Sequence, residues 1–322
     1  KTSENYLKIG IQDYLSKISR FCSISINVLK SHTNKSLYTN EIIKLETKSI
    51  FQVIKPKDFL ICLVIQVRKQ WLGFQDAPFS SNVSYSGAVN NRSALAINFV
   101  HDVTLPSQQS EMQLNYAYHI PLNDNNFNLA FGIGAKLLYY RLKFDISDIP
   151  PGQDPAFNAD LVDELTGDAS AGALFYSENF YFSYSQTNIL ESAFNTDDGK
   201  GFKLNNGYRN HYYDVSYSFN IIDNDWHLQP SIMINSNKNR TLYNFNTRLH
   251  HLKNKWIGTN YRSDNTIYFA FGFDLNDISI SYCYEHSFNG NIMIHNYGSH
   301  QIGIAYKFVS ELSERHISFW DY

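Results

Sequence analysis

The stretch "GSHQIGIAYKF", from Gly298 to Phe308, alternates between two unlike files of side chains. One file holds His300, Ile302, Ile304, Tyr306 and Phe308, and the other holds Gln301, Gly303, Ala305 and Lys307. A period of two residues is that of a β-strand with one apolar face and one polar face. The stretch therefore predicts a strand, and the question becomes which solvent each face meets.

The same alternation recurs through most of the chain. It is clearest in "MQLNYAY" (112–118), "FNLAFGIGAKL" (127–137), "YDVSYSFNI" (213–221), "IYFAFGF" (267–273) and "ISISYCY" (278–284). The polar files consist mostly of Ser, Asn, Gly and Ala, whereas the exposed faces of soluble sheets usually carry more charge. The pattern favours a membrane barrel with a wet interior over a soluble β-sandwich or propeller, which also alternate.

The composition agrees with a barrel. Only 18% of the 322 residues are charged and 16% are aromatic, whereas about 25% of residues are charged in typical soluble domains. The longest clean apolar run, "FLICLVI" (59–65), is far shorter than the roughly 20 residues that a membrane helix needs. The net charge of −3 gives no basic signal for nucleic acid, and the three cysteines form no CxxC pair. The chain starts at Lys1 without a visible secretory signal, so we expect a processed, truncated or unusual start.

The alternation predicts about 14 antiparallel strands. They are expected at 58–71, 80–89, 92–101, 110–122, 127–144, 169–176, 179–186, 211–222, 226–236, 241–250, 255–262, 266–274, 277–285 and 300–308. Every second connection is turn-like, and the intervening ones include 72–79, 102–109, 145–168, 187–210 and 286–299. Outer-membrane barrels place short turns in the periplasm and long loops outside. We therefore predict an all-β transmembrane antiparallel β-barrel in the outer membrane, with both chain ends on the periplasmic side.

Several stretches resemble the PorP/SprF family of the type IX secretion and gliding machinery of Bacteroidota. They are "RKQWLGFQDAP" (68–78), "LNYAYHIPL" (114–122), "LAFGIGAKL" (129–137), "DPAFN" (154–158), "LQPSIMI" (228–234), "WIGTNYRSDNTIYFAFGFDLND" (256–277) and "YGSHQIGIAYKF" (297–308). The resemblance covers roughly residues 66–308 in order. It implies an outer-membrane barrel tied to the secretion and surface attachment of large proteins, including gliding adhesins, that carry a C-terminal sorting domain.

Two regions depart from the family pattern. Residues 1–57 lack the usual Gln-rich start and "NPA…G" motif, and they hold ten Lys or Arg against four Asp or Glu. They form either a basic periplasmic helix or, as we favour, a divergent segment without chemistry of its own. The family normally ends at a Tyr-x-Phe, here Tyr306 to Phe308, which makes 309–322 an extension. The expected organisation is an unassigned segment 1–57, a barrel 58–308 and an extension 309–322.

Candidate partner-binding residues lie in two expected outer loops. The acidic loop 145–168 contains no Lys or Arg, and the loop 286–299 carries apolar side chains. These apolar side chains either meet a partner or fold inward and plug the barrel. The candidates are Asp148, Asp154, Phe157, Asp160, Asp163, Phe288, Ile292 and Ile294. The acidic loop would steer a basic partner or hold Ca²⁺, but its spacing matches no calcium loop, so we expect a solvated loop, no metal and no cofactor. We expect deletion of 148–163, combined with Ile292→Ser and Ile294→Ser, to release a surface partner from an inserted barrel.

A second set of residues matches the family motifs, for which the resemblance implies a structural role. These residues are Gln70, Trp71, Gly73, Pro78, Tyr261, Arg262, Gly298, His300 and Phe308.

The sequence offers little support for an enzyme. It has no G-x-S-x-G, H-E-x-x-H or phosphate-loop motif. Ser299 and His300 point to opposite sides of a strand, so they cannot act together in an outer-membrane hydrolase. The first function hypothesis is a non-enzymatic barrel that anchors or helps export a surface protein, with outer-membrane lipid and periplasmic secretion-motor components as further partners. The alternative is a passive diffusion porin.

The expected lipid face can be tested by substitution. It includes Leu114, Tyr116, Leu129, Phe131, Phe219, Phe269, Phe271, Ile280, Ile302 and Ile304. Arg in this face costs roughly 2–4 kcal/mol at the membrane midplane. We therefore expect Phe271→Arg to impair assembly and Gly272→Ser, in the polar file, to matter much less.

Overall fold

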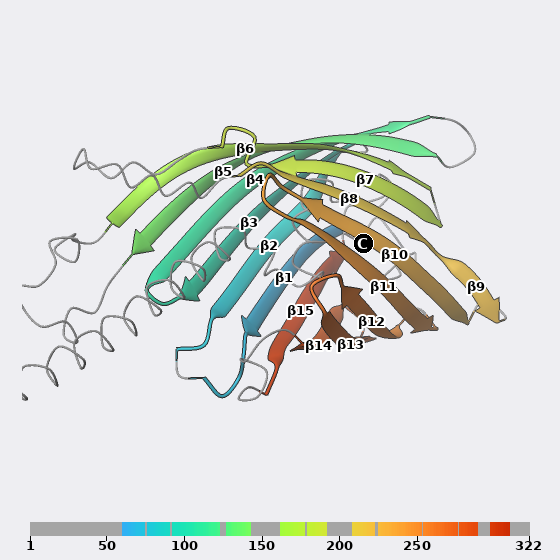
Figure 1. Cartoon of the computed structure of the whole chain (residues 1–322). Helices are drawn as coiled ribbons and strands as arrows, with labels where there is room; N and C mark the ends of the chain where they lie inside the picture. The colour runs from blue at the N-terminus through green and yellow to red at the C-terminus, as the bar shows by residue number, and fades with distance from the viewer. Residues whose placement is uncertain are drawn as a thin grey trace, which may run out of the picture.

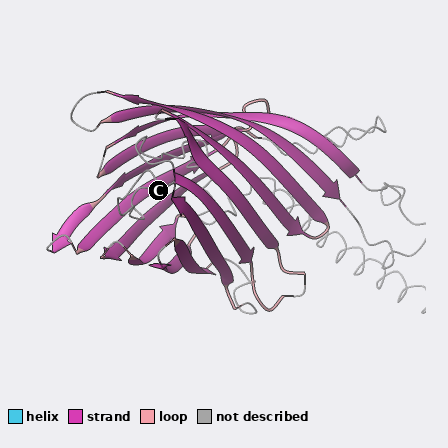
Figure 2. Cartoon of the chain, turned by 180° about the vertical axis from the view of Figure 1, so that it is seen from behind, coloured by secondary structure: helices cyan, strands magenta, loops and turns pink. Residues whose placement is uncertain are grey.

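The structure, a computed structural model, describes residues 60–74, 76–90, 92–122, 127–142, 162–177, 179–191, 208–222, 225–252, 254–275, 277–288 and 297–309. All regular secondary structure in these residues is β-strand (Figures 1 and 2). Within the same ranges, no helix is long and apolar enough to cross a membrane. The expected N-terminal segment 1–57 lies outside the described residues, and so does the expected extension 309–322 apart from Val309, the last residue of the final strand.

The chain forms fifteen strand segments. They are β1 (Leu60–Lys69), β2 (Phe79–Asn90), β3 (Ser93–Thr104), β4 (Ser107–Pro121), β5 (Asn128–Leu142), β6 (Val162–Tyr176), β7 (Phe180–Thr187), β8 (Asn210–Tyr217), β9 (Phe219–Ile222), β10 (Trp226–Ser236), β11 (Thr241–His251), β12 (Lys255–Arg262), β13 (Thr266–Leu275), β14 (Ile278–Ser287) and β15 (Ser299–Val309). Segments β8 and β9 both pair with β10 and are separated by Ser218 alone. They are two pieces of one interrupted strand, so the fifteen segments make a barrel of fourteen strands, as predicted.

The sheet is antiparallel and closes on itself. Each strand pairs with its neighbour in the chain, and β1 pairs with β15 along ten residues from Leu60↔Val309 to Lys69↔His300. Figure 1 shows this seam where the blue first strand lies beside the red last strand. Because a closed barrel has no free edge, every strand can satisfy its backbone hydrogen bonds within the sheet, which is the requirement for crossing a bilayer.

The two ends of the barrel differ. One end, here called the turn end, holds the short connections 91–92, 122–127, 177–179, 223–225, 252–254 and 276–277, and also Leu60 and Val309. The other, the loop end, holds the connections 70–78, 105–106, 237–240 and 263–265, together with the strand ends that flank 143–161, 192–207 and 289–296. The predicted alternation of short and long connections is thus confirmed in most positions.

The predicted bounds of two loops were wrong. Residues 102–109 were expected to form a loop, but β3 and β4 continue to a tight turn at Leu105 and Pro106. The acidic loop 145–168 is shorter than expected, because β6 begins at Val162 and pairs with β5 up to Leu142. In both places the strands carry polar residues on their two faces, which hides the alternation.

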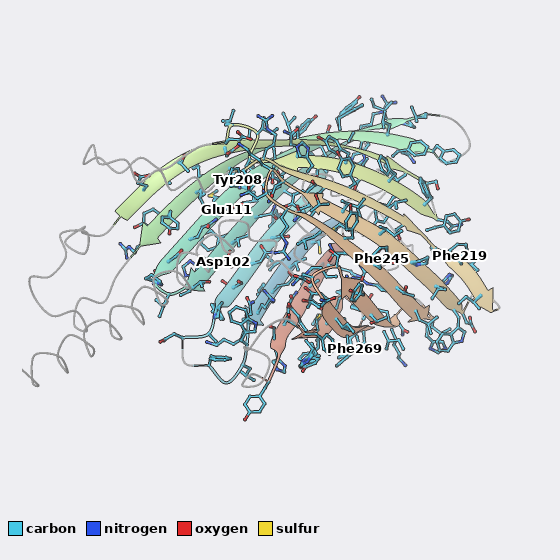
Figure 3. The ribbon with its side chains drawn as sticks, in the orientation of Figure 1. Asp102, Glu111, Tyr208, Phe219, Phe245 and Phe269 are labelled. Atoms are coloured by element: carbon cyan, nitrogen blue, oxygen red, sulfur yellow. The ribbon has the colours of Figure 1, made fainter. Side chains whose placement is uncertain are left out.

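The outward file is apolar and exposed, as predicted. In β4, buried and exposed residues alternate strictly from Glu111 to Ile120. Of the ten residues predicted to face lipid, all but Leu129 and Ile280 are more than a third exposed, and these two, which are partly covered, lie on the same face. Figure 3 labels three members of the outward file, Phe219, Phe245 and Phe269.

The inward file is polar, but it is buried rather than openly wet. Asp102 and Glu111, labelled in Figure 3, belong to it, and both are buried. Gln113 shows the packing: its Nε2 donates to Asn115 Oδ1 and to Ser170 Oγ, each at 2.9 Å. Along this wall, the polar side chains therefore pack on one another.

Candidate functional site

The loop end carries a bridge that continues the β1–β15 seam beyond both strands. The Leu72 amide donates to the Gly298 carbonyl, and the Tyr297 amide donates to the Leu72 carbonyl, each at 2.8 Å. Gly298 has a φ of +82°, and a Cβ there would overlap the ring of Tyr284 and the carbonyl of Glu285. Only glycine fits this backbone and this space. We call this pairing the rim bridge.

The 70–78 connection has its own internal bonds. The Gln70 amide donates to the Pro78 carbonyl at 2.9 Å, which closes the turn, and the side chain of Gln70 is buried. Within the turn, Trp71 and Gly73 have positive φ values of 49° and 106°. The motif residues near the start of the barrel therefore shape the turn that the rim bridge joins to Gly298. Segments far apart in the sequence meet at one place on the rim.

A buried ion network lies on the inner wall beneath the bridge. Glu285 of β14 accepts a hydrogen bond from the Arg68 guanidinium of β1 and lies 3.6 Å from Arg262 of β12. Arg262 also bonds to Asp264 at 2.8 Å and donates to the Tyr268 hydroxyl. The side chains of Arg68, Glu285 and Arg262 are at most 7% exposed. The network ties β1, β12, β13 and β14 together.

The network reaches the loop-end turns through Asp264. Arg240, in the 237–240 turn, lies 3.1 Å from Asp264, in the 263–265 turn. Burial by itself would raise the pKa of Asp264, but the hydrogen bond and charge of Arg262, aided by Arg240, lower it below its ordinary value of 3.8. The carboxylate therefore stays charged at neutral pH and holds two turns together.

The base of the 188–209 connection is fastened to the inner wall. Lys136 Nζ of β5 donates to Asn188 Oδ1 at 2.6 Å, and Asp168 of β6 accepts from the Leu190 amide at 3.0 Å. The two ends of the connection also meet, since Asn188 Nδ2 donates to the Tyr208 carbonyl at 3.3 Å. The base of this long connection is therefore fixed.

Four large apolar side chains are exposed around the rim bridge, and we call them the rim patch. Leu72 and Phe74 come from the 70–78 turn, Phe288 follows β14, and Tyr297 precedes β15. They are between 39% and 74% exposed. Their backbones are held by hydrogen bonds, including that from the Phe288 amide to the Asn265 carbonyl at 2.8 Å. Exposed apolar side chains on a fixed backbone form a ready contact surface.

The structure places the sequence candidates as follows. Asp148, Asp154, Phe157, Asp160, Ile292 and Ile294 lie outside the described residues. Asp163 does not lie in a loop, because it belongs to β6 and pairs with Arg141 of β5. Phe288 is exposed at the loop end, as expected.

The remaining motif residues are spread over both faces of the wall. Tyr261 faces outward, and its hydroxyl donates to Asn265 Oδ1 at 3.0 Å. His300 also faces outward, next to Tyr282. Phe308 pairs with Ile61 in the seam. Only Arg262 belongs to the inner ion network.

Sequence reasoning missed Arg68 and Glu285 as members of a shared site. The one signal available is a charge in the polar file of an alternating strand: Glu285 is the one acidic residue of β14, and Arg68 lies in the polar file of β1. No metal centre stands beside the network: within the described ranges, no group of three His, Cys, Asp or Glu could hold an ion.

A closed antiparallel barrel with an apolar outer file and a polar inner file is the fold of a bacterial outer-membrane protein. The solved structures that resemble it include the Ralstonia pickettii toluene transporter TbuX, at 9% identity over 82% of this chain and 93% of that chain, with a TM-score of 0.52. The Pseudomonas putida toluene transporter TodX (10% identity, 83% and 92% coverage, TM-score 0.49) and the Acinetobacter baumannii outer membrane protein Omp33 (9%, 79% and 100%, 0.47) are further matches. At such identity, TbuX supports the fold alone.

The family follows from the sequence match. Residues 60–306 match the model of the type IX secretion system membrane protein PorP/SprF. The chain belongs to this family, and it is a membrane protein of the type IX secretion system in the outer membrane. No curated protein matches the chain.

Proposed function

We propose that the protein is a non-enzymatic barrel whose loop end holds, or helps to export, a secreted surface protein through that protein's C-terminal sorting domain. The observation that supports this most is the rim patch of Leu72, Phe74, Phe288 and Tyr297 on a bonded backbone. Burying one such side chain against a partner is worth about 1.5–3 kcal/mol. A few anchors of this kind dominate most protein interfaces.

The acidic connection between β5 and β6 would complete the surface. Its candidates Asp148, Asp154, Phe157 and Asp160 lie in the sequence between β5 and β6. In this proposal they steer a basic partner surface towards the mouth, and the apolar rim then retains it. Periplasmic components of the secretion motor meet the opposite, turn end.

The experiment is a pull-down from native membranes with two loop-end variants. The first carries Leu72→Ser and Phe288→Ser, and the second combines a deletion of 148–160 with Ile292→Ser and Ile294→Ser. The deletion stops at 160 because β6 begins at Val162. Both variants should insert and remain heat-modifiable on gels, yet retain at least tenfold less surface protein, the effect expected from losing about 1.4 kcal/mol or more.

The matched control is Leu122→Ser, which removes an exposed leucine at the turn end (51%, against 41% for Leu72). It should leave retention unchanged. Normal retention by both loop-end variants would place the contact elsewhere and overturn the proposal.

The competing function is a passive diffusion pore. Fourteen strands can enclose a water channel, but the inward side chains of this barrel, such as Arg68 and Asn115, are 1–2% exposed. Single-channel recording in planar bilayers separates the two functions. A partner-holding barrel should be nearly silent, whereas a steady, large conductance would favour the pore.

A further inference from the structure

Lys69 is an unusual residue on the outer face of the barrel. It ends the outward file of β1, after Ile65 and Val67, and pairs with His300 of β15 on one side and Phe79 of β2 on the other. Across the described outward positions of β13, β14, β15, β1 and β2, it is the sole Lys, Arg, Asp or Glu. No described acidic side chain forms an ion pair with it.

The surroundings of Lys69 mark the depth of the membrane–water interface. On the same outer face, the Tyr282 hydroxyl lies 2.6 Å from His300 Nδ1, and the Tyr284 hydroxyl lies 3.3 Å from His286 Nδ1. Tyrosines and other amphipathic rings gather where headgroups begin. The ammonium of Lys69 therefore lies at headgroup level, above an apolar band.

The imidazole of His300, the ladder partner of Lys69, is already hydrogen-bonded. His300 is occupied on both nitrogens, since its Nε2 lies 3.2 Å from the Tyr297 carbonyl and donates to it. The ammonium of Lys69 is therefore the charged donor that this part of the outer face offers to an anion.

We propose that this outer patch, made by Lys69 with Tyr282 and Tyr284 of β14 on the same face, binds the phosphate of an anionic lipid in the leaflet at the loop end. Charge complementarity supports this occupant. A lysine stem packs along apolar surface while its ammonium reaches the headgroups, and an acid-free lipid-facing surface has a positive field there. The phosphate supplies the counter-charge that the five strands lack.

The contrast with β5 supports the same reading. Arg141, near the loop end of that strand, has Asp163 directly opposite it in the ladder. Lys69 has His300 and Phe79 in the corresponding positions. Arg141 therefore has an acidic residue as its ladder partner, and Lys69 has none.

The test measures lipid binding to the purified full-length barrel by native mass spectrometry. The probes are dioleoylphosphatidylglycerol and dioleoylphosphatidylcholine, which share their acyl chains. The unsubstituted barrel should prefer phosphatidylglycerol, and Lys69→Met should weaken that binding about fivefold, the effect of one basic residue near an anionic surface. Lys69→Arg should keep the preference.

Lys238→Met is the control, because Lys238 is an exposed cation in the 237–240 turn outside the patch. It should bind phosphatidylglycerol like the unsubstituted barrel. Heat-modifiable migration checks that every variant is folded.

Three results would overturn the proposal. They are equal lipid binding by Lys69→Met and the unsubstituted barrel, no preference for the anionic lipid, and loss of a bound lipid to excess inorganic phosphate, which would indicate a site for the free ion. A dimer in the same spectra that binds no lipid would also overturn the proposal, because a second copy of the chain would then cover the patch.

Discussion

The indole of Trp256 lies over Gly272, its direct partner in the β12–β13 ladder. A Cβ on Gly272 would overlap Nε1 and two carbons of the indole. Arg248 covers the same indole, with its guanidinium carbon 4.6 Å from the ring centroid. The indole is therefore enclosed, and it cannot move away without disturbing the inner wall.

Gly272→Ser should consequently damage the barrel, contrary to what the polar file alone suggests. Overpacking of this kind costs about 1–3 kcal/mol, which should lower the temperature at which the barrel loses its heat-modifiable migration. Ala270→Ser, on the same strand and face, is the control and should be nearly neutral. If both variants lose heat-modifiable migration at the same temperature as the unsubstituted barrel, Trp256 does not pack against Gly272.

Phe271→Arg tests the lipid face. Phe271 is 48% exposed between Ile257 and Tyr282, and Arg at the midplane of such a face costs roughly 2–4 kcal/mol. Refolding into vesicles should fall steeply for this variant, whereas Phe271→Leu should refold well. Normal refolding of Phe271→Arg would mean that this face does not meet lipid.

Glu285→Gln tests the buried network. The change keeps the side-chain shape but leaves Arg68 without its counter-charge and weakens the hold on Arg262. Breaking a buried pair from one side costs about 3–5 kcal/mol, which should appear as a lower urea midpoint. Glu111→Gln, which removes a single partner from Lys136, should cost less.

A double replacement distinguishes the cost of an unpaired buried charge from the cost of lost side-chain packing. Arg68→Leu together with Glu285→Leu removes both charges, and Arg262 still has Asp264. This variant should be more stable than Glu285→Gln. Equal or lower stability would show that the network acts through packing rather than charge.

The stability of the 263–265 turn should decrease at acidic pH. Its folded pKa lies below the ordinary 3.8, so its stabilising contribution is present above that value and is lost as the pH falls below it. The protection factors of the 263–265 amides, which correct the exchange rates for their intrinsic pH dependence, should fall between about pH 5 and pH 2. Asp264→Asn should exchange fast throughout, and Asp225→Asn, at the turn end, should change nothing here.

Much of the fold could be predicted because the bilayer enforces alternation. Strands such as 226–236 and 255–262 were predicted with their observed bounds, since one face of each meets lipid. The same constraint identified the outward file, Phe131 and Ile302 included.

The errors fall where that constraint ends. At Ser107–Ser110 and at the start of β6, the strands extend to the loop end, where both faces carry polar residues and no apolar period remains to be read. The ion network was hidden for a different reason. Arg68 and Glu285 are 217 positions apart, and their meeting depends on the register of the seam, which no local pattern specifies.

The seam between β1 and β15 also determines when the rim can exist. The first strand cannot complete its hydrogen bonds until the last strand has been made and brought round, and a chain lacking β15 would leave β1 and β14 as open edges prone to mispairing. The bonds between Leu72 and the pair Tyr297 and Gly298 form only after that closure. A contact surface built on this bridge is therefore displayed by finished barrels alone, so unfinished copies in the membrane would not compete for cargo.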